Sequence, residues 1–211
     1  MSQPEPDGER ILQERFGTIA RAAAFYKSQV LTYLNPQMKR FIHDQDMMFI
    51  ATADGKGQCD CSFRSGSRGF VQVLGSARLA YPEYRGNGVM ASLGNLVANP
   101  HIGIIFLDFC HSTIGLHVNG TARVLSNDEV AQDQAATGDM LAALQVKGGR
   151  RPECWVLVDI LEAYIHCSKH VPLLQKATKH IEWGTDDEAL KGGDFFQAKT
   201  SARIPDDSPV K

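Results

Sequence analysis

The chain has 211 residues, 43% hydrophobic and 22% charged, so it can fill one core and is too short for two comfortable domains. With a net charge of −2, the protein as a whole does not attract nucleic acid. Any site for an anion must therefore come from a local cluster of basic groups. Five cysteines without regular spacing favour a reducing compartment, which predicts a cytoplasmic protein. The polar, acidic start of the chain and the lack of a long apolar run predict neither export nor membrane insertion.

Helices are expected before the core. Residues 9–34 carry apolar side chains at helical spacing, which predicts an amphipathic helix with a possible break near Gly17. Asn35 and Pro36 are typical of a cap followed by a first-turn proline, so a second helix is expected through about Gln45. Residues 1–45 are therefore predicted to be a tail, disordered over residues 1–8, and helices that pack on the following domain.

Strand patterns dominate residues 46–172, which we predict to form one domain. Short Gly, Ser or Asp turns separate them, which favours an antiparallel sheet or small barrel over alternating parallel units. The fold class expected is α+β, mainly β, and six strands are enough to close a small barrel. The strand-like segments are residues 47–54, 58–66, 69–74, 77–81, 101–109, 115–125 and 155–167.

The remaining segments are expected to be helical or irregular. Residues 126–144 begin with the cap-like pair Ser126 and Asn127 and predict a helix, which a basic loop follows. Residues 173–211 are predicted to be a helical or irregular tail, with short helices around residues 172–179 and 186–190.

The stretch over residues 81–100 is the most informative part of the chain. It reads as a strand end, a polar glycine loop, a helix over residues 89–98 and a stop at Asn99 and Pro100. Gly86 and Gly88 permit backbone conformations that other residues avoid, and the helix start would offer unpaired N–H groups. We therefore predict an anion-binding loop, whose donors would come from Arg85, Asn87, Ser92 and Asn95. The alternative is a glycine turn that binds nothing, because the spacing matches neither the dinucleotide fingerprint nor the Walker loop.

Other residues suggest chemistry less strongly. Arg64 and Arg68 end the second strand-like segment and would lie beside the Arg85 loop in a small barrel, where converging arginines suit phosphate. A solubilising role at the surface is the alternative for Arg64 and the preferred interpretation for Arg68. The cysteine and histidine pairs around Cys59 and Cys167 lack metal-ligand spacing, so we expect no metal site, and nothing marks Cys167 as a nucleophile.

A resemblance covers about Phe41 to Pro172. The segments MMFIATAD, GQCDCSFRSG, YPEYRGNGVMASLGNLVANPHIGIIFLDF, GLHVNGTARV and AYIHCSKH resemble the pyridoxamine 5'-phosphate oxidase-like family of FMN-binding split barrels. The resemblance implies a six-stranded antiparallel barrel that forms a homodimer, with FMN in two symmetric clefts at the interface. The loop and the resemblance together give these expected cofactor contacts: Ser62, Arg64, Ser65, Tyr84, Arg85, Gly86, Asn87, Ser92, Asn95, Cys167, Lys169, His170 and Trp183.

The chain departs from the true oxidases of this family. Those enzymes carry R-x-V-L-L-K on the second strand and a terminal arginine-histidine motif, where this chain has CSFRSG and ARIPDDSPVK. Oxidation of a vitamin B6 phosphate is therefore not expected.

The function we expect is that of an FMN-dependent oxidoreductase with an unidentified substrate and electron donor. Arg64 is the best single candidate to stabilise charge on a reduced flavin. Three alternatives stay open: a deazaflavin-dependent reductase, whose longer cofactor could use Lys147, Arg150 and Arg151; a flavin-binding module without turnover; and a split barrel with an empty cleft.

Overall fold

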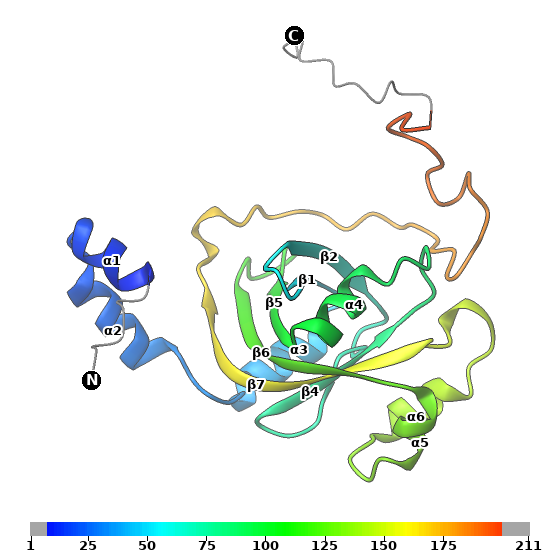
Figure 1. Cartoon of the computed structure of the whole chain (residues 1–211), viewed down its shortest axis with the longest axis horizontal. Helices are drawn as coiled ribbons and strands as arrows, with labels where there is room; N and C mark the ends of the chain where they lie inside the picture. Colours follow the sequence, from blue (N-terminus) through cyan, green and yellow to red (C-terminus); the bar gives the residue numbers. More distant parts are fainter. Residues whose placement is uncertain (1–7, 200–211) are drawn as a thin grey trace.

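One antiparallel sheet of seven strands organises the protein, and Figure 1 shows how it curves around the helix α4. The computed structural model describes residues 8–199. The strands are β1 (Met47–Ala53), β2 (Cys59–Ser65), β3 (Gln72–Val73), β4 (Arg78–Glu83), β5 (His101–Leu107), β6 (Gly115–Leu125) and β7 (Cys154–His166). They lie in the order β2-β1-β5-β6-β7-β4-β3, and every pairing is antiparallel.

The expected α+β class is confirmed, whereas a closed six-stranded barrel is not. The sheet has seven strands, and β2 and β3 remain at its two edges. β3 is only two residues long, too short to supply a ladder that would close the sheet against β2.

The predicted hairpin at Asp54 is confirmed, and it fixes the register of the edge strand. The carboxylate of Asp54 accepts hydrogen bonds from the backbone N–H groups of Lys56 and Gln58 at 2.8 and 2.9 Å. In β1, Met48 and Ile50 point into the core, and Ser62 of β2 pairs with Ile50. The turn therefore decides which residues of β2 face the site, because a one-residue slip would reverse them.

The core lies inside the curved sheet and beneath the helices. Tyr81, Phe106 and Val118 are fully buried there, with Ile42 from a covering helix. β6 shifts register against β7 between Asn119 and Gly120, and a Cβ at Gly120 would lie 2.2 Å from a β7 carbonyl oxygen. The two longest strands thus bend together and wrap the core.

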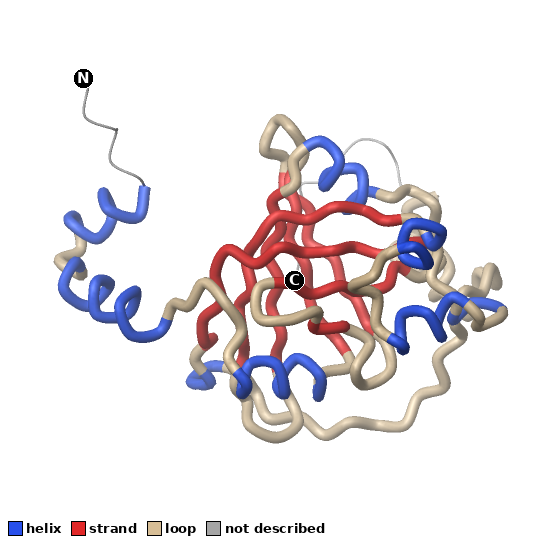
Figure 2. Tube along the Cα trace, turned by 90° about the horizontal axis from the view of Figure 1, so that it is seen from below, coloured by secondary structure: helices blue, strands red, loops and turns tan. Residues whose placement is uncertain are grey.

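The N-terminal helices are broken where the sequence predicts it. Gly17 has φ +64° and separates α1 (Gly8–Arg15) from α2 (Ile19–Gln29). These two helices bury no residue and project from the body, as Figure 2 shows. α3 (Pro36–Asp44) begins as predicted, with Asn35 accepting from the Met38 N–H at 2.9 Å, and it buries Ile42.

Two expectations about the later helices are wrong. The helix expected over residues 126–144 is two helices, α5 (Asn127–Gln132) and α6 (Gly138–Leu144), because a turn at Asp133 interrupts it. The helices expected around residues 172–179 and 186–190 are absent: residues 171–180 have no regular structure and residues 188–196 form turns. Leu173 and Leu174 stay 67% and 50% exposed, and short helices in water depend on packing an apolar face.

The other described elements are α4 (Ala91–Ala98) and two 3₁₀ turns, η1 (Gly148–Arg150) and η2 (Ser168–His170). Within residues 8–199, none of the helices combines the length and apolar character needed to cross a bilayer. Our expectations for residues 1–7 and 200–211 lie outside the described residues.

Candidate functional site

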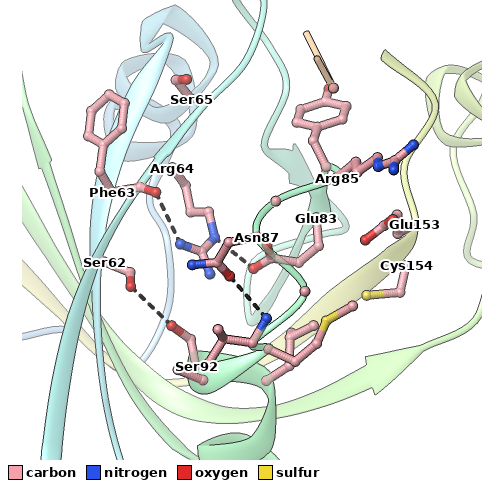
Figure 3. A pocket seen from close by; sticks show the side chains of 18 of the residues that line it. Ser62, Phe63, Arg64, Ser65, Glu83, Arg85, Asn87, Ser92, Glu153 and Cys154 are labelled. Atoms are coloured by element: carbon pink, nitrogen blue, oxygen red, sulfur yellow. Dashed lines mark hydrogen bonds and ion pairs between the residues drawn. The ribbon is translucent and has the colours of Figure 1, made fainter. Parts of the chain in front are cut away.

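A pocket of about 540 Å³ opens where β2 ends, beside the glycine loop and the first turn of α4 (Figure 3). Residues 181–184 of the C-terminal tail form part of its outer wall. A volume of this size falls within the roughly 300–1,000 Å³ of small-molecule sites. Segments separated by about a hundred residues of sequence therefore enclose one ligand-sized space.

Two hydroxyls and a carboxylate lie together on the wall formed by β2 and α4. Ser92 and Ser62 both donate to Oδ2 of Asp60, at 2.8 and 3.1 Å, and their hydroxyl oxygens are 3.2 Å apart. Ser92 is 4% exposed. Because a hydroxyl rotates freely, the same two side chains can turn their protons toward an anion in the pocket.

The start of α4 provides backbone donors at the same place. Met90 occupies the cap position with φ 57°, and its side chain makes no capping hydrogen bond. The N–H groups of Ala91, Ser92 and Leu93 have no acceptor within the helix, and all three residues line the pocket. Asn87 accepts from the Val89 N–H at 3.0 Å and so shapes the loop that leads into the helix.

Arg64 lies at the floor of the pocket in a fixed orientation. Its Nε donates to Glu83 at 2.7 Å and its NH1 group to the carbonyl of Phe63 at 3.0 Å. The side chains of Arg64 and Glu83 are 20% and 10% exposed. Burial raises the pKa of Glu83, and the adjacent Arg64 charge opposes that shift. Burial and the charges of Glu83 and Glu153 raise the pKa of the Cys154 thiol to about 11.

Arg85 has a different partner and direction. Its guanidinium points away from Arg64 in Figure 3 and donates to Asp186 of the tail at 2.6 Å. These two arginines share the pocket lining with the carboxylates of Asp60, Glu83, Glu153 and Glu182. The pocket lining therefore carries no excess of positive charge. An anion there depends on oriented hydroxyl and N–H donors and on any arginine that exchanges its carboxylate partner for the anion.

Aromatic side chains form the outer wall. The ring of Trp183 meets Tyr84 edge-on with centroids 5.0 Å apart, and the Arg150 guanidinium lies 5.7 Å from the Trp183 ring. Burial raises the pKa of Tyr84, so this phenol stays neutral. This part of the lining therefore offers aromatic surface, beside the charged side chains of Arg85 and Glu182.

Comparison with known families decides the relationship. A family model described as pyridoxamine 5'-phosphate oxidase matches residues 34–167. The chain belongs to this family. The matched region contains β1 to β7 and α4, while the tail wall lies beyond it.

Solved structures give further likenesses for this family member. HupZ from Group A Streptococcus is 23% identical, with a TM-score of 0.46, covering 62% of this chain and 91% of its own. A FAD-binding protein from Mesorhizobium loti is 13% identical (TM-score 0.44; 64% and 96% covered). HutZ from Vibrio cholerae, described as a heme storage protein, is 18% identical (TM-score 0.38; 63% and 93% covered). Comparison with curated proteins finds no significant match.

Most of the residues expected to contact the cofactor lie at the pocket, but some do not. Those that line it are Ser62, Arg64, Ser65, Tyr84, Arg85, Gly86, Asn87, Ser92 and Trp183. Asn95 does not, because it donates to the Thr52 hydroxyl at 3.0 Å and ties α4 to β1. Cys167, Lys169 and His170 lie beyond the opposite end of β7 from Cys154. Arg68 does not converge on the pocket: it pairs with Asp44 on α3 at the surface, in line with the solubilising role preferred for it.

Several pocket residues escaped the sequence prediction as ligand-site residues, and those with ionisable side chains are Asp60, Glu83, Glu153, Cys154 and Glu182. A signal existed for one of them. Glu83 follows Leu79 and Tyr81 at two-residue spacing on β4, so it had to face the same way as these buried side chains. Cys154 carried no such signal, because the pairing of β4 with β7 places it there. Among residues 8–199, no group of three His, Cys, Asp or Glu side chains could hold a metal ion.

Proposed function

We propose that this pocket binds a phosphorylated flavin of the FMN type and that the protein is an oxidoreductase that uses it. One observation supports this proposal most. The hydroxyls of Ser62 and Ser92, the uncapped start of α4 and Arg64 all line the same pocket, and the chain belongs to the pyridoxamine 5'-phosphate oxidase family. When bound, the flavin would supply hydride or electron transfer.

The donor set fits such a group. Ser62, Ser92, the first N–H groups of α4 and the Arg85 guanidinium would hold the phosphate, since charge-assisted bonds from arginine, hydroxyls and helix N-termini favour it. Arg64, fixed by Glu83, would present its remaining N–H groups to the ring. Trp183 and Tyr84 would cover a face of the ring and exclude water.

We also propose that a second copy of the chain completes the site. Apolar side chains at the pocket are exposed in the single chain: Phe63 is 52%, Val89 70% and Met90 48% exposed. A symmetric partner would cover them and would bring its own copies of Cys167, Lys169 and His170 toward the flavin. Light scattering after size exclusion tests this, because a monomer at micromolar concentration would contradict the shared site. The five free cysteines support a cytoplasmic location.

An absorbance spectrum of the freshly purified protein, with mass spectrometry of whatever heat releases, tests the proposal. Flavin bands with the mass of FMN would support it. Stabilisation by a deazaflavin but not by FMN would favour the alternative cofactor, and tight FMN that no nicotinamide donor reduces would favour a binding module. A haem Soret band, or no ligand and no stabilisation by any flavin, would contradict it.

A further inference from the structure

The tail crosses the molecule as a strap, which we define as residues 171–186. It leaves the end of β7, runs over the sheet and reaches the loop before α4 on the far side (Figure 1). The Leu174 N–H donates to the Phe109 carbonyl at 2.7 Å, and Lys176 pairs with Asp46. The strap lies outside the matched family region, residues 34–167.

The strap is seated against the pocket by a close backbone contact. A Cβ at Gly149 would lie 1.8 Å from the Trp183 carbonyl oxygen, so only glycine permits the approach. Gly184 has φ +66° and faces Gly149. This contact holds Trp183 against Tyr84 and sets the following residues beside Arg85.

Beyond that contact, the strap ends at Asp186, whose carboxylate pairs with Arg85. Asp186 accepts from the NH2 group of Arg85 at 2.6 Å, and the two side chains are 65% and 54% exposed. An ion pair this exposed is weakly held and exchanges readily. Arg85 also lines the pocket, where a phosphate would offer it more acceptor oxygens and more charge than one carboxylate.

We propose that Asp186 is a built-in competitor of the ligand: its carboxylate and the phosphate of the ligand compete for Arg85. An occupied pocket therefore releases residues 186–190 while Trp183 stays seated, and an empty one keeps Arg85 neutralised. This inference rests on the proposed flavin site, and it adds a regulatory contact from the tail.

The test compares Asp186→Asn with Glu188→Gln, a matched loss of one negative charge. Glu188 pairs with Lys199 and does not line the pocket. Arg85→Ala and the double variant that combines Arg85→Ala with Asp186→Asn complete a double-mutant cycle. FMN is titrated by quenching of flavin fluorescence at low ionic strength, and inorganic phosphate separately by ³¹P NMR. Hydrogen exchange of residues 181–190 is followed with and without each anion.

Removing the competitor should tighten FMN binding about two- to fivefold in Asp186→Asn, the range expected for an exposed pair, with no change in Glu188→Gln. Arg85→Ala should weaken binding and abolish the effect of Asp186→Asn. In the wild type, either anion should speed exchange at residues 186–190 to the rate of Asp186→Asn.

Other results overturn specific parts. Equal affinities for Asp186→Asn and Glu188→Gln, or tightening that persists without Arg85, would refute the competition. If no variant binds FMN but phosphate binds in the predicted order, the flavin proposal fails and the competition stands. If neither anion binds the wild type or Asp186→Asn, both fail.

Discussion

The Arg64 guanidinium lies 2.7 Å from the Glu83 carboxylate, and this pair joins the end of β2 to the end of β4 beneath the pocket. It links residues 19 positions apart on strands at opposite sides of the sheet order. A charge pair so placed both braces the pocket floor and orients Arg64.

Arg64→Ala should destabilise the protein more at pH 8 than at pH 5. Burial already raises the pKa of Glu83, and losing Arg64 raises it further. A raised pKa means that the folded state holds the proton more tightly, so stability is lost as pH rises above the ordinary carboxyl value. We expect a loss of about 1–3 kcal/mol at pH 8, from urea unfolding at both pH values.

Arg78→Ala is the matched control, because Arg78 pairs with Asp159 at the same 2.7 Å but is 42% exposed. Its effect should be small and independent of pH. Equal losses of unfolding free energy at pH 5 and pH 8 for Arg64→Ala would mean that burial does not raise the pKa of Glu83.

Ser92→Ala and Asn95→Ala should separate binding from stability, although both residues lie on α4. Losing the Ser92 hydroxyl should weaken FMN binding about fivefold, the value of one hydrogen bond near 1 kcal/mol. Asn95→Ala breaks the bond to Thr52 and should lower the melting temperature by a few degrees, with FMN affinity changed less than about twofold. Weaker FMN binding by Asn95→Ala than by Ser92→Ala would place the ligand elsewhere on α4.

Gly149→Ala should unseat the strap, because the new methyl group would overlap the Trp183 carbonyl. We expect greater quenching of Trp183 by acrylamide and weaker FMN binding, while Trp155, 2% exposed, stays protected. Gly138→Ala is the control, since nothing lies within 4 Å of a Cβ there. Unchanged quenching in Gly149→Ala would show that the strap does not rest on this glycine.

Asp108→Asn should destabilise the turn between β5 and β6 at neutral pH and much less near pH 2. Burial alone would raise the pKa of Asp108, yet bonds from Ser112, Cys110 and His111 outweigh it and lower the pKa from 3.8 to about 2. A lowered pKa stabilises the fold above the ordinary value and loses that contribution as pH falls. Thermal unfolding of both proteins from pH 7 to pH 2 should therefore show converging stabilities; a constant gap would contradict this.

Cys154 should resist alkylation at pH 8. Its pKa of about 11 leaves little thiolate, whereas Cys59, Cys61 and Cys167 are exposed. Mass spectrometry after brief iodoacetamide treatment should find those three modified at least about tenfold faster than Cys154. Rapid modification of Cys154 would mean that the pocket floor opens to solvent.

The sequence by itself determined the local elements and the family. Alternation, turn residues and caps predicted the β1–β2 hairpin, the break at Gly17 and the start of α3, because such signals act within a few residues. The YRGNG loop and the helix after it were likewise located from their own residues.

Only the tertiary structure decided which of those residues share a site. Pairing of β4 with β7 brings Cys154 to Glu83, and the route of the strap brings Trp183 and Asp186 to Tyr84 and Arg85. Asn95 faces Thr52 instead of the pocket. Contacts between segments a hundred residues apart depend on the order of the strands in the sheet and on backbone packing. Neither of these produces a periodic pattern in the sequence.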